Sequence, residues 1–542
     1  MNGFRRIVLA AVVFCVSVAC GVQPAWACTG IYVGPKASDD GTTIIARSND
    51  YQDIWGNHVT VTDRVENEPG RTMPIDAHGA VMTELPETTY KYTATPFLAS
   101  TMYANDLQND ASASTNEYGV ALTMAVTAFA NDTALKADPL IENGLTENTA
   151  TDLVICQSKT AREAVDVLLS LIEKYGSSEC NIALIADQSE AWYVEMYTGH
   201  QYAAVKLPAD RVSAFGNEYT MEYLSDYEEQ IVSKDLERLA KDNGFAVYGD
   251  KNELNLFDTY SGDDVTTAYS HMRTWIGHQV LAPSQFDGDY DARARYPLCF
   301  KADKPVGISD VCALLRNRYE GTQYDPDQTG RIDMRVIGTD TALSVHALQV
   351  YPNLPADMSC VTWVSSGPAI YGVFVPVSNA ATSISAPYAK DQPAKDAGKF
   401  DTEHYAYYAF KELSTLCVEQ VDCTIYGKPV RDYWKSAEQG MFSSVPEVLS
   451  RASQLEDRDA AADYITTYCN RAQIRAFLDA KQLLNDVMWT KSKNSNTLKL
   501  LKNPETHQYM DEERTLPPME VSLDASAYGT VPDAPSQASS AS

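Results

Sequence analysis

Two apolar runs near the start of the chain predict a pair of β-strands. The segments 28–33 (CTGIYV) and 42–47 (TTIIAR) are rich in β-branched and aromatic residues, as is typical of strands. Between them, 38–41 (SDDG) has the residues of a turn. An Asp-Gly pair between two β-prone runs favours a hairpin.

A long helical segment is predicted over 145–176. Thr160 with Glu163 makes a capping box at a helix start, and Gly176 is a helix terminator. Apolar residues recur at helical spacing along one face. These are Ala161, Val165, Leu168 and Ile172. The pattern indicates an amphipathic helix.

Strands and helices follow in mixed order along the rest of the chain. Residues 115–129 have a turn followed by a strand pattern, and 180–187 and 190–197 are two apolar strands joined by a short turn. The region 400–490 is mostly helical in pattern. Because strands and helices do not alternate strictly, we expect an α+β layered sandwich.

The first 27 residues differ from the remainder. Arg5 and Arg6 precede an apolar run over 7–22, and the segment closes on Ala25-Trp26-Ala27. A basic start, an apolar middle and a small-x-small end are typical of a secretory signal peptide. We therefore expect cleavage after Ala27 and a secreted or extracytoplasmic protein.

Two other interpretations of this leader stay open. A membrane anchor would need a longer span, since about 20 apolar residues cross a bilayer, and Cys20 is a lipoprotein-like alternative. No second apolar stretch is long enough to cross a membrane. We expect no stable membrane anchor once the leader 1–27 is removed.

Composition and charge narrow the function classes. The chain has 542 residues, 44% of them hydrophobic, and a formal net charge of -30. So acidic a surface repels phosphate backbones, which argues against a nucleic-acid partner. We expect a catalytic unit over 28–500, and a disordered tail over 520–542 because that segment is rich in Pro, Ser, Ala and Asp. The oligomeric state stays open, a homo-oligomer included.

Cysteine usage agrees with export. Nine cysteines follow the leader, an odd number, and in an oxidising compartment most would pair. Cys28 is the natural unpaired residue, which leaves eight for up to four disulfides, Cys417 with Cys423 among them. The alternative is that several are simply buried thiols.

The chemistry of Cys28 follows from its place directly after the predicted cleavage site. An amino-terminal cysteine can use its own α-amine, with a pKa of about 7.7–8.0, as the base that accepts the thiol proton. If the hairpin turn is centred near residues 37–39, Cys28 lies across from roughly Arg47 to Asp50. Arg47 would lower the thiol pKa and Asp50 would orient the amine. A structural Arg47–Asp50 salt bridge is the alternative.

Several segments together resemble the N-terminal-nucleophile (Ntn) cysteine dipeptidases of the dipeptidase A type. More distantly they resemble the penicillin V acylases and bile salt hydrolases. The resemblance spans roughly 28–480. It rests on CTGIYVGPKASDDGTTIIARSNDY from Cys28, with Arg-x-x-Asp after the hairpin, and on 116–122, 158–176, 186–200 and 319–325.

The resemblance implies a four-layer αββα Ntn-hydrolase sandwich, with a helical C-terminal part, that cleaves amide bonds without metal or cofactor. It implies that Asn217 is an oxyanion-hole donor and that Arg273 is a later active-site arginine; a turn asparagine and a salt bridge are the respective alternatives. Asn116 either fixes a loop near the site or forms a turn. The strand after it reads TMAVTAF, which departs from the family pattern and leaves substrate recognition open.

Other catalytic signatures are weak or absent in the sequence. Residues 325–333 resemble the start of a calcium loop, but Val336 stands where a bidentate Glu is needed. There is no His-Glu-x-x-His, no paired Cys-x-x-Cys and no Gly-x-Ser-x-Gly, which argues against zinc and α/β-hydrolase serine enzymes.

The leading hypothesis is a secreted, cysteine-dependent dipeptidase, a thiol protease that acts on small peptides through an acyl-enzyme on Cys28. An amidase of the same fold that removes an N-acyl group is the nearest rival. A non-catalytic exported surface protein is a rival of another class.

Overall fold

The computed structural model describes residues 28–50, 57–96, 111–262, 268–329, 335–390, 399–418, 425–500, 505 and 518–535. The expected leader over 1–27 lies outside these residues. The division of the chain into a leader and a catalytic unit over 28–500 therefore stays a prediction.

A six-stranded sheet carries the start of the described chain. Every pairing in it is antiparallel, and the predicted hairpin supplies two of its interior strands. In spatial order its strands are β14 (Val212–Phe215), β1 (Thr29–Val33), β2 (Thr43–Asp50), β16 (Ala342–Val350), β17 (Cys360–Ser366) and β18 (Val375–Ser378).

An eight-stranded antiparallel sheet faces the first one. Its strands are β15 (Gln230–Val232), β13 (Tyr202–Lys206), β12 (Ala191–Met196), β11 (Asn181–Ala186), β10 (Ala121–Thr127), β9 (Ala111–Asn116), β8 (Tyr92–Pro96) and β3 (Thr60–Thr62). Two small ribbons lie outside it: β4 (Val65–Glu66) with β7 (Thr88–Thr89), and β5 (Thr72–Pro74) with β6 (Met82–Glu84).

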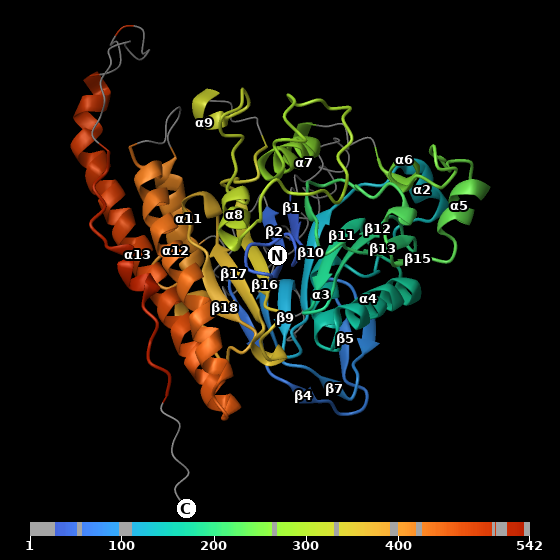
Figure 1. Ribbon diagram of the computed structural model, residues 1–542, viewed down its shortest axis with the longest axis horizontal. Coiled ribbons are helices and arrows are strands. Elements are labelled where there is room, and N and C mark those ends of the chain that lie inside the picture. The colour runs from blue at the N-terminus through green and yellow to red at the C-terminus, as the bar shows by residue number, and fades with distance from the viewer. Residues whose placement is uncertain are drawn as a thin grey trace, which may run out of the picture.

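The two sheets stack with a shared apolar layer between them, to which β1, β2, β10, β11 and β16 contribute. Helices α3 (Glu147–Ile155) and α4 (Ala161–Tyr175) cover the outer face of the larger sheet. On the outer face of the smaller sheet lie α7 (Ala268–Leu281), α8 (Ile308–Leu314), α11 (Ala406–Cys417), α12 (Gly427–Ser453) and α13 (Arg458–Leu500) (Figure 1). The order helix, sheet, sheet, helix is the αββα sandwich that the resemblance implied.

Short helices join these layers. They are α2 (Asp132–Ala137), α5 (Leu236–Asp242), α6 (Leu256–Tyr260), α9 (Pro326–Thr329) and α10 (Ala386–Ala389), with 3-10 turns η2 (Leu224–Asp226), η4 (Ala356–Met358), η5 (Ala369–Tyr371) and η7 (Ala525–Gly529). Among the helices in the described ranges, none is both long enough and apolar enough to cross a bilayer.

The helix predicted over 145–176 is divided into α3 and α4. The capping residue Thr160 explains the division, since its side chain accepts from the Glu163 backbone N–H at 3.1 Å and so begins a new helix. Gly176 ends α4 with a φ of 73°, a conformation that glycine adopts without strain. The helical region predicted over 400–490 is confirmed as α11, α12 and α13.

The expected disordered tail over 520–542 is corrected in its first part. Residues 518–535 pack on the pair α12 and α13, and Tyr528 is only 3% exposed. Its hydroxyl donates to Asp479 Oδ2 at 2.9 Å, and Pro532 accepts from the Tyr464 hydroxyl at 2.7 Å. Composition suggested disorder, but one buried aromatic anchors the segment.

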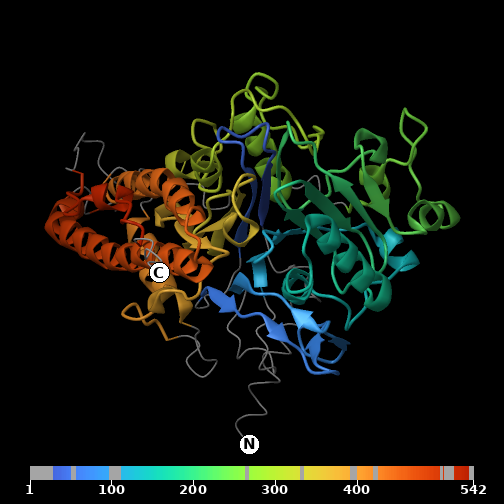
Figure 2. The same ribbon diagram turned by 60° about the horizontal axis from the view of Figure 1, so that its bottom comes forward.

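Figure 2 shows α12 and α13 (orange to red) side by side, far from α3 and α4.

Replacing Tyr528 by alanine is expected to lower the free energy of unfolding by about 3 kcal/mol, because it leaves a cavity between α12 and α13. Thermal unfolding measures this. Tyr248→Ala is the control: Tyr248 is 42% exposed, so its loss should cost within about 0.5 kcal/mol. Equal effects of the two substitutions would contradict the packing of this tail.

The expected disulfides are corrected. Of the eight cysteines expected to pair, six are free thiols: Cys156, Cys180, Cys299, Cys312, Cys360 and Cys469. Cys156 belongs to one apolar cluster, Cys180, Cys299 and Cys360 to a second, and Cys312 and Cys469 to a third. A shared cluster does not by itself make a disulfide, which needs Cα atoms within about 7 Å. Only the pair of Cys417 with Cys423 is left, and Cys423 lies outside the described residues. The alternative of buried thiols holds for five of these six, and Cys299 is a partly buried thiol.

Candidate active site

Cys28 lies directly before β1, and the hairpin decides what it faces. β1 and β2 pair with Thr29 opposite Ser48, so the next position places Cys28 opposite Asn49. The register expected from the turn, which set Cys28 across from Arg47 to Asp50, is confirmed.

The period of two along β2 sorts its polar residues between two faces. Ile45 and Cys28 belong to the apolar layer between the sheets, and Arg47 and Asn49 share that face. The Arg47 guanidinium donates from Nη2 to Cys28 Sγ at 3.0 Å and to Asn49 Oδ1 at 3.3 Å. Asp50 projects from the opposite face, toward the helices. The sequence therefore brings the cation, and not the carboxylate, to the thiol.

A close approach of α7 to β14 brings together two residues that are distant in sequence. Gly216 follows β14, and a Cβ there would stand 2.4 Å from the carbonyl oxygen of Ser270. Only glycine permits this packing. Its amide donates to Thr274 Oγ1 at 3.0 Å. The result is that Asn217 and Arg273 lie beside Cys28, as the resemblance implied.

Asn217 holds the backbone nitrogen of Cys28. Its Oδ1 accepts from that N–H at 2.9 Å and from Arg273 Nη2 at 2.7 Å, while its Nδ2 donates to the Thr127 carbonyl at 2.7 Å. The three contacts agree on the orientation of the amide. Arg273 Nη1 also donates to the carbonyl of Cys28, so both backbone polar groups of Cys28 are held.

Asp50 contacts arginine and not the nitrogen of Cys28. Arg335 donates from Nη2 to Asp50 Oδ2 at 3.2 Å. The centroid of the Tyr269 ring lies 5.7 Å from the guanidinium of Arg273 and 5.5 Å from that of Arg335. We expected Asp50 to orient the nitrogen of Cys28, but in the structure Asn217 Oδ1 accepts the hydrogen bond from that nitrogen. The reason is that side chains alternate between the two faces of β2, which places Asp50 on the face away from Cys28.

Burial dominates the electrostatics of the site. It raises the pKa of the Cys28 thiol; Glu147 and Asp50 raise the pKa further, against the lowering effect of Arg47. Burial also raises the pKa of Asp50 to about 6, although Arg335 opposes it. The thiol is therefore protonated at neutral pH, and a nucleophilic reaction needs a base to remove its proton.

A buried carboxylate that the sequence analysis missed lies behind Arg47. Glu147 forms an ion pair with Arg47 Nη2, and the two side chains are 2% and 1% exposed. Asn181 Nδ2 and Thr127 Oγ1 donate to Glu147 Oε2 at 3.1 and 3.3 Å. Thr146 caps the helix that Glu147 begins. An acidic first turn is ordinary in helices, so nothing in the sequence set this residue apart.

Asn116 is a turn residue. Its side-chain nitrogen donates to the carbonyls of Ile155 and Ser158 at 2.8 and 2.7 Å, and its oxygen accepts from the Tyr118 N–H at 3.0 Å. The turn-forming alternative is confirmed.

Where the structure describes it, the calcium-like segment is the short helix α9 with Asp325 directly before it. Asp325 Oδ1 accepts from the Asp327 N–H at 2.9 Å, and the Asp327 carboxylate pairs with Arg318. Within the described residues, no three His, Cys, Asp or Glu side chains gather as a set of metal ligands.

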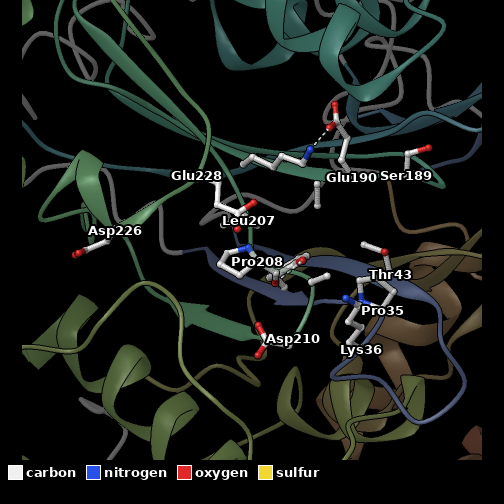
Figure 3. Close-up of a pocket in the computed structure, with 14 residues that line it drawn as sticks. Pro35, Lys36, Thr43, Ser189, Glu190, Leu207, Pro208, Asp210, Asp226 and Glu228 are labelled. Carbon is white, nitrogen blue, oxygen red and sulfur yellow. Dashed lines mark hydrogen bonds and ion pairs between the residues drawn. The ribbon is translucent and has the colours of Figure 1, made fainter.

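A cavity of about 390 Å³ lies at the other end of the hairpin (Figure 3). Pro35 and Lys36 line it, and Lys206 Nζ contacts Glu190 at 2.8 Å. β1 runs from Cys28 toward this cavity and its five residues span about 17 Å. The cavity is therefore separate from the thiol.

The αββα layers, with a buried thiol directly before a strand of the smaller sheet, are the architecture that the resemblance to Ntn hydrolases implied. Peptidase family C69 matches residues 27–435, which is most of the chain, and the protein belongs to that family. It is a peptide hydrolase.

Curated relatives agree with this assignment. The chain is 28% identical over 358 residues to a probable dipeptidase B of Streptococcus pyogenes serotype M1, covering 63% of this chain and 70% of that protein. It is 30% identical over 373 residues to a probable dipeptidase B of Lactococcus lactis, covering 67% and 76%.

A solved structure of a conjugated bile acid hydrolase variant from Clostridium perfringens matches with a TM-score of 0.31 and 10% identity. The match covers 62% of this chain and 89% of that one. A match at this level adds nothing to the assignment made from the chain itself.

Proposed function

We propose that the protein is an exported dipeptidase that works through an acyl-enzyme on Cys28, with the α-amine of Cys28 as the base. One observation carries the proposal: the thiol and the backbone nitrogen of Cys28 each have a dedicated polar partner, Arg47 at 3.0 Å and Asn217 at 2.9 Å. The names of the curated relatives support the choice of substrate.

The first half-reaction transfers an acyl group. Cleavage after Ala27 converts the nitrogen held by Asn217 from an amide into an amine. That amine accepts the thiol proton while Sγ bonds to the scissile carbonyl carbon. The carbon–nitrogen bond then breaks, and the ammonium proton passes to the leaving nitrogen.

The second half-reaction releases the acid. The amine takes a proton from water as the water oxygen attacks the thioester, and the carbon–sulfur bond breaks with the proton returned to Sγ. Arg47 stabilises negative charge on sulfur at both stages. The second hydrogen on Asn217 Nδ2, which Thr127 does not use, is the proposed donor to the oxyanion.

A panel of substrates tests the function. The processed enzyme should hydrolyse unmodified dipeptides with far higher kcat/KM than N-acyl amides such as penicillin V or conjugated bile acids. Cleavage of the acyl amides alone would overturn the dipeptidase assignment and leave an acylase. Absence of turnover on both would favour the non-catalytic alternative.

Asn217→Ala is expected to lower kcat by about 10²–10³-fold, since an oxyanion donor contributes about that much. Steady-state kinetics measure the effect. Asn379→Ala is the matched control: this asparagine is equally buried but donates to the carbonyls of Asn116 and Ala356, away from the thiol. Its folded fraction should retain kcat. A kcat within threefold of wild type in Asn217→Ala would contradict the proposed role.

Export is tested at the amino terminus. We expect the mature protein outside the cytoplasm to begin at Cys28. Amino-terminal sequencing of the protein recovered from that compartment measures it. An active protein that begins upstream of Cys28 would contradict both the cleavage site and the proposed base.

A further inference from the structure

The Arg47 guanidinium lies between two groups that compete for it. On one side Nη2 is 3.0 Å from Cys28 Sγ, and on the other it forms an ion pair with Glu147. Both charged side chains are almost fully buried. A buried cation needs a counter-charge, and at rest Glu147 supplies it.

The Glu147 carboxylate is itself held from three elements. α3 supplies its backbone, Asn181 on β11 and Thr127 at the end of β10 donate to Oε2, and its backbone N–H donates to Glu179 Oε1 at 2.5 Å. Thr127 connects the two halves of the site, because its carbonyl accepts from Asn217 while its hydroxyl holds Glu147. A carboxylate fixed in this way fixes the guanidinium that it contacts.

We propose that Glu147 is a positioning residue, which holds Arg47 against the thiol and keeps that thiol protonated until the α-amine takes its proton. The inference rests on the proposed function. Without the carboxylate, Arg47 would be a lone buried cation, and a thiolate formed by loss of the proton to solvent would become its partner. Transfer of the thiol proton to the α-amine would then no longer be the step that generates the nucleophile.

The effect of Glu147 on the pKa of the Cys28 thiol can be distinguished from that of the other charges around it. The charged and titratable groups near Cys28 and Arg47 are Asp50, Glu147, Glu179, Tyr269, Arg273, Arg335 and His346. Among the carboxylates that raise the thiol pKa, Glu147 ranks ahead of Asp50. Of these two, Glu147 alone contacts Arg47 directly.

Glu147→Gln keeps the shape of the side chain and removes the charge. In the processed enzyme, the rate of Cys28 alkylation by iodoacetamide is measured against pH, with the site resolved by mass spectrometry. The midpoint is expected to fall by about one to two pH units, because removing a nearby negative charge in a buried site favours the thiolate. kcat/KM is expected to fall about 10- to 100-fold, since displacing a positioned group has effects of that size. An unchanged or higher midpoint would overturn the inference.

Glu147→Asp tests positioning without loss of charge, and it serves if Glu147→Gln does not fold. The shorter side chain should lower kcat/KM about tenfold with the alkylation midpoint within half a pH unit of wild type. Unchanged kcat/KM would overturn the positioning role.

Glu438→Gln is the matched control. It breaks the ion pair between Glu438, which lies on α12, and Arg316, which follows α8. This pair is remote from the thiol, so its loss should destabilise the fold without moving the midpoint. A similar shift in this variant would overturn the inference. Alkylation does not require turnover, so the result is separable from the proposed function: turnover by Cys28→Ala would defeat that function, whatever the midpoint.

Discussion

Cys28→Ala is expected to abolish dipeptide hydrolysis, with a loss of at least about 10⁴-fold in kcat, as for removal of other catalytic nucleophiles. Three described side chains that contact Cys28 directly, Arg47, Asn217 and Arg273, carry no nucleophile that could take the place of Sγ. The fold should persist because alanine is smaller and apolar. Steady-state kinetics and thermal unfolding measure the two outcomes.

Cys180→Ala is the matched control for this loss. Cys180 is also a buried free thiol and belongs to the same apolar layer between the sheets, but its Sγ lies 3.1 Å from the Tyr197 carbonyl. The variant should turn over substrate near the wild-type rate. Activity retained by Cys28→Ala, or lost equally by both variants, would exclude Cys28 as the specific nucleophile.

A protein made to begin at Ala27 is expected to lose about 10²–10⁴-fold in kcat, the usual contribution of a general base. The nitrogen of Cys28 is then an amide. It still donates to Asn217 Oδ1, so the site stays assembled, but an amide cannot accept the thiol proton. Kinetics on the purified protein, with its start verified by mass spectrometry, measure the loss.

The comparison protein is the same chain released to begin at Cys28. It should be fully active under identical conditions. If the two proteins have equal kcat, the base is a side chain and not the α-amine. His346 is a poor substitute for that base: it lies opposite Arg47 in the pairing of β16 with β2, and burial lowers its pKa to about 3.

Local patterns predicted much of the fold. The hairpin register followed from the lengths of two apolar runs and the turn between them, because the strand period is fixed. The start of α4 followed from the side chain of Thr160, and its end from Gly176. The pattern does not predict the break between α3 and α4, because the apolar spacing continues past the capping residue Thr160 as if the two helices were one.

Part of the candidate site was predictable for the same reason. Cys28 and Arg47 are neighbours on one hairpin, so spacing alone places them together. Asn217 and Arg273 are far along the chain, and only the resemblance to a family suggested them. The contacts of Asp50 were not predicted, because it lies on the face of β2 opposite to the thiol.

The sequence by itself determined the elements whose information is local: the hairpin that carries Cys28, the capped helices and the apolar face of α4. The tertiary structure alone decided which charges meet. Glu147 forms an ion pair with Arg47 only because the two sheets stack and α3 packs on the larger of them. Pairing of buried charges depends on packing between residues distant in sequence and on their removal from solvent. The spacing of residues along a chain predicts neither.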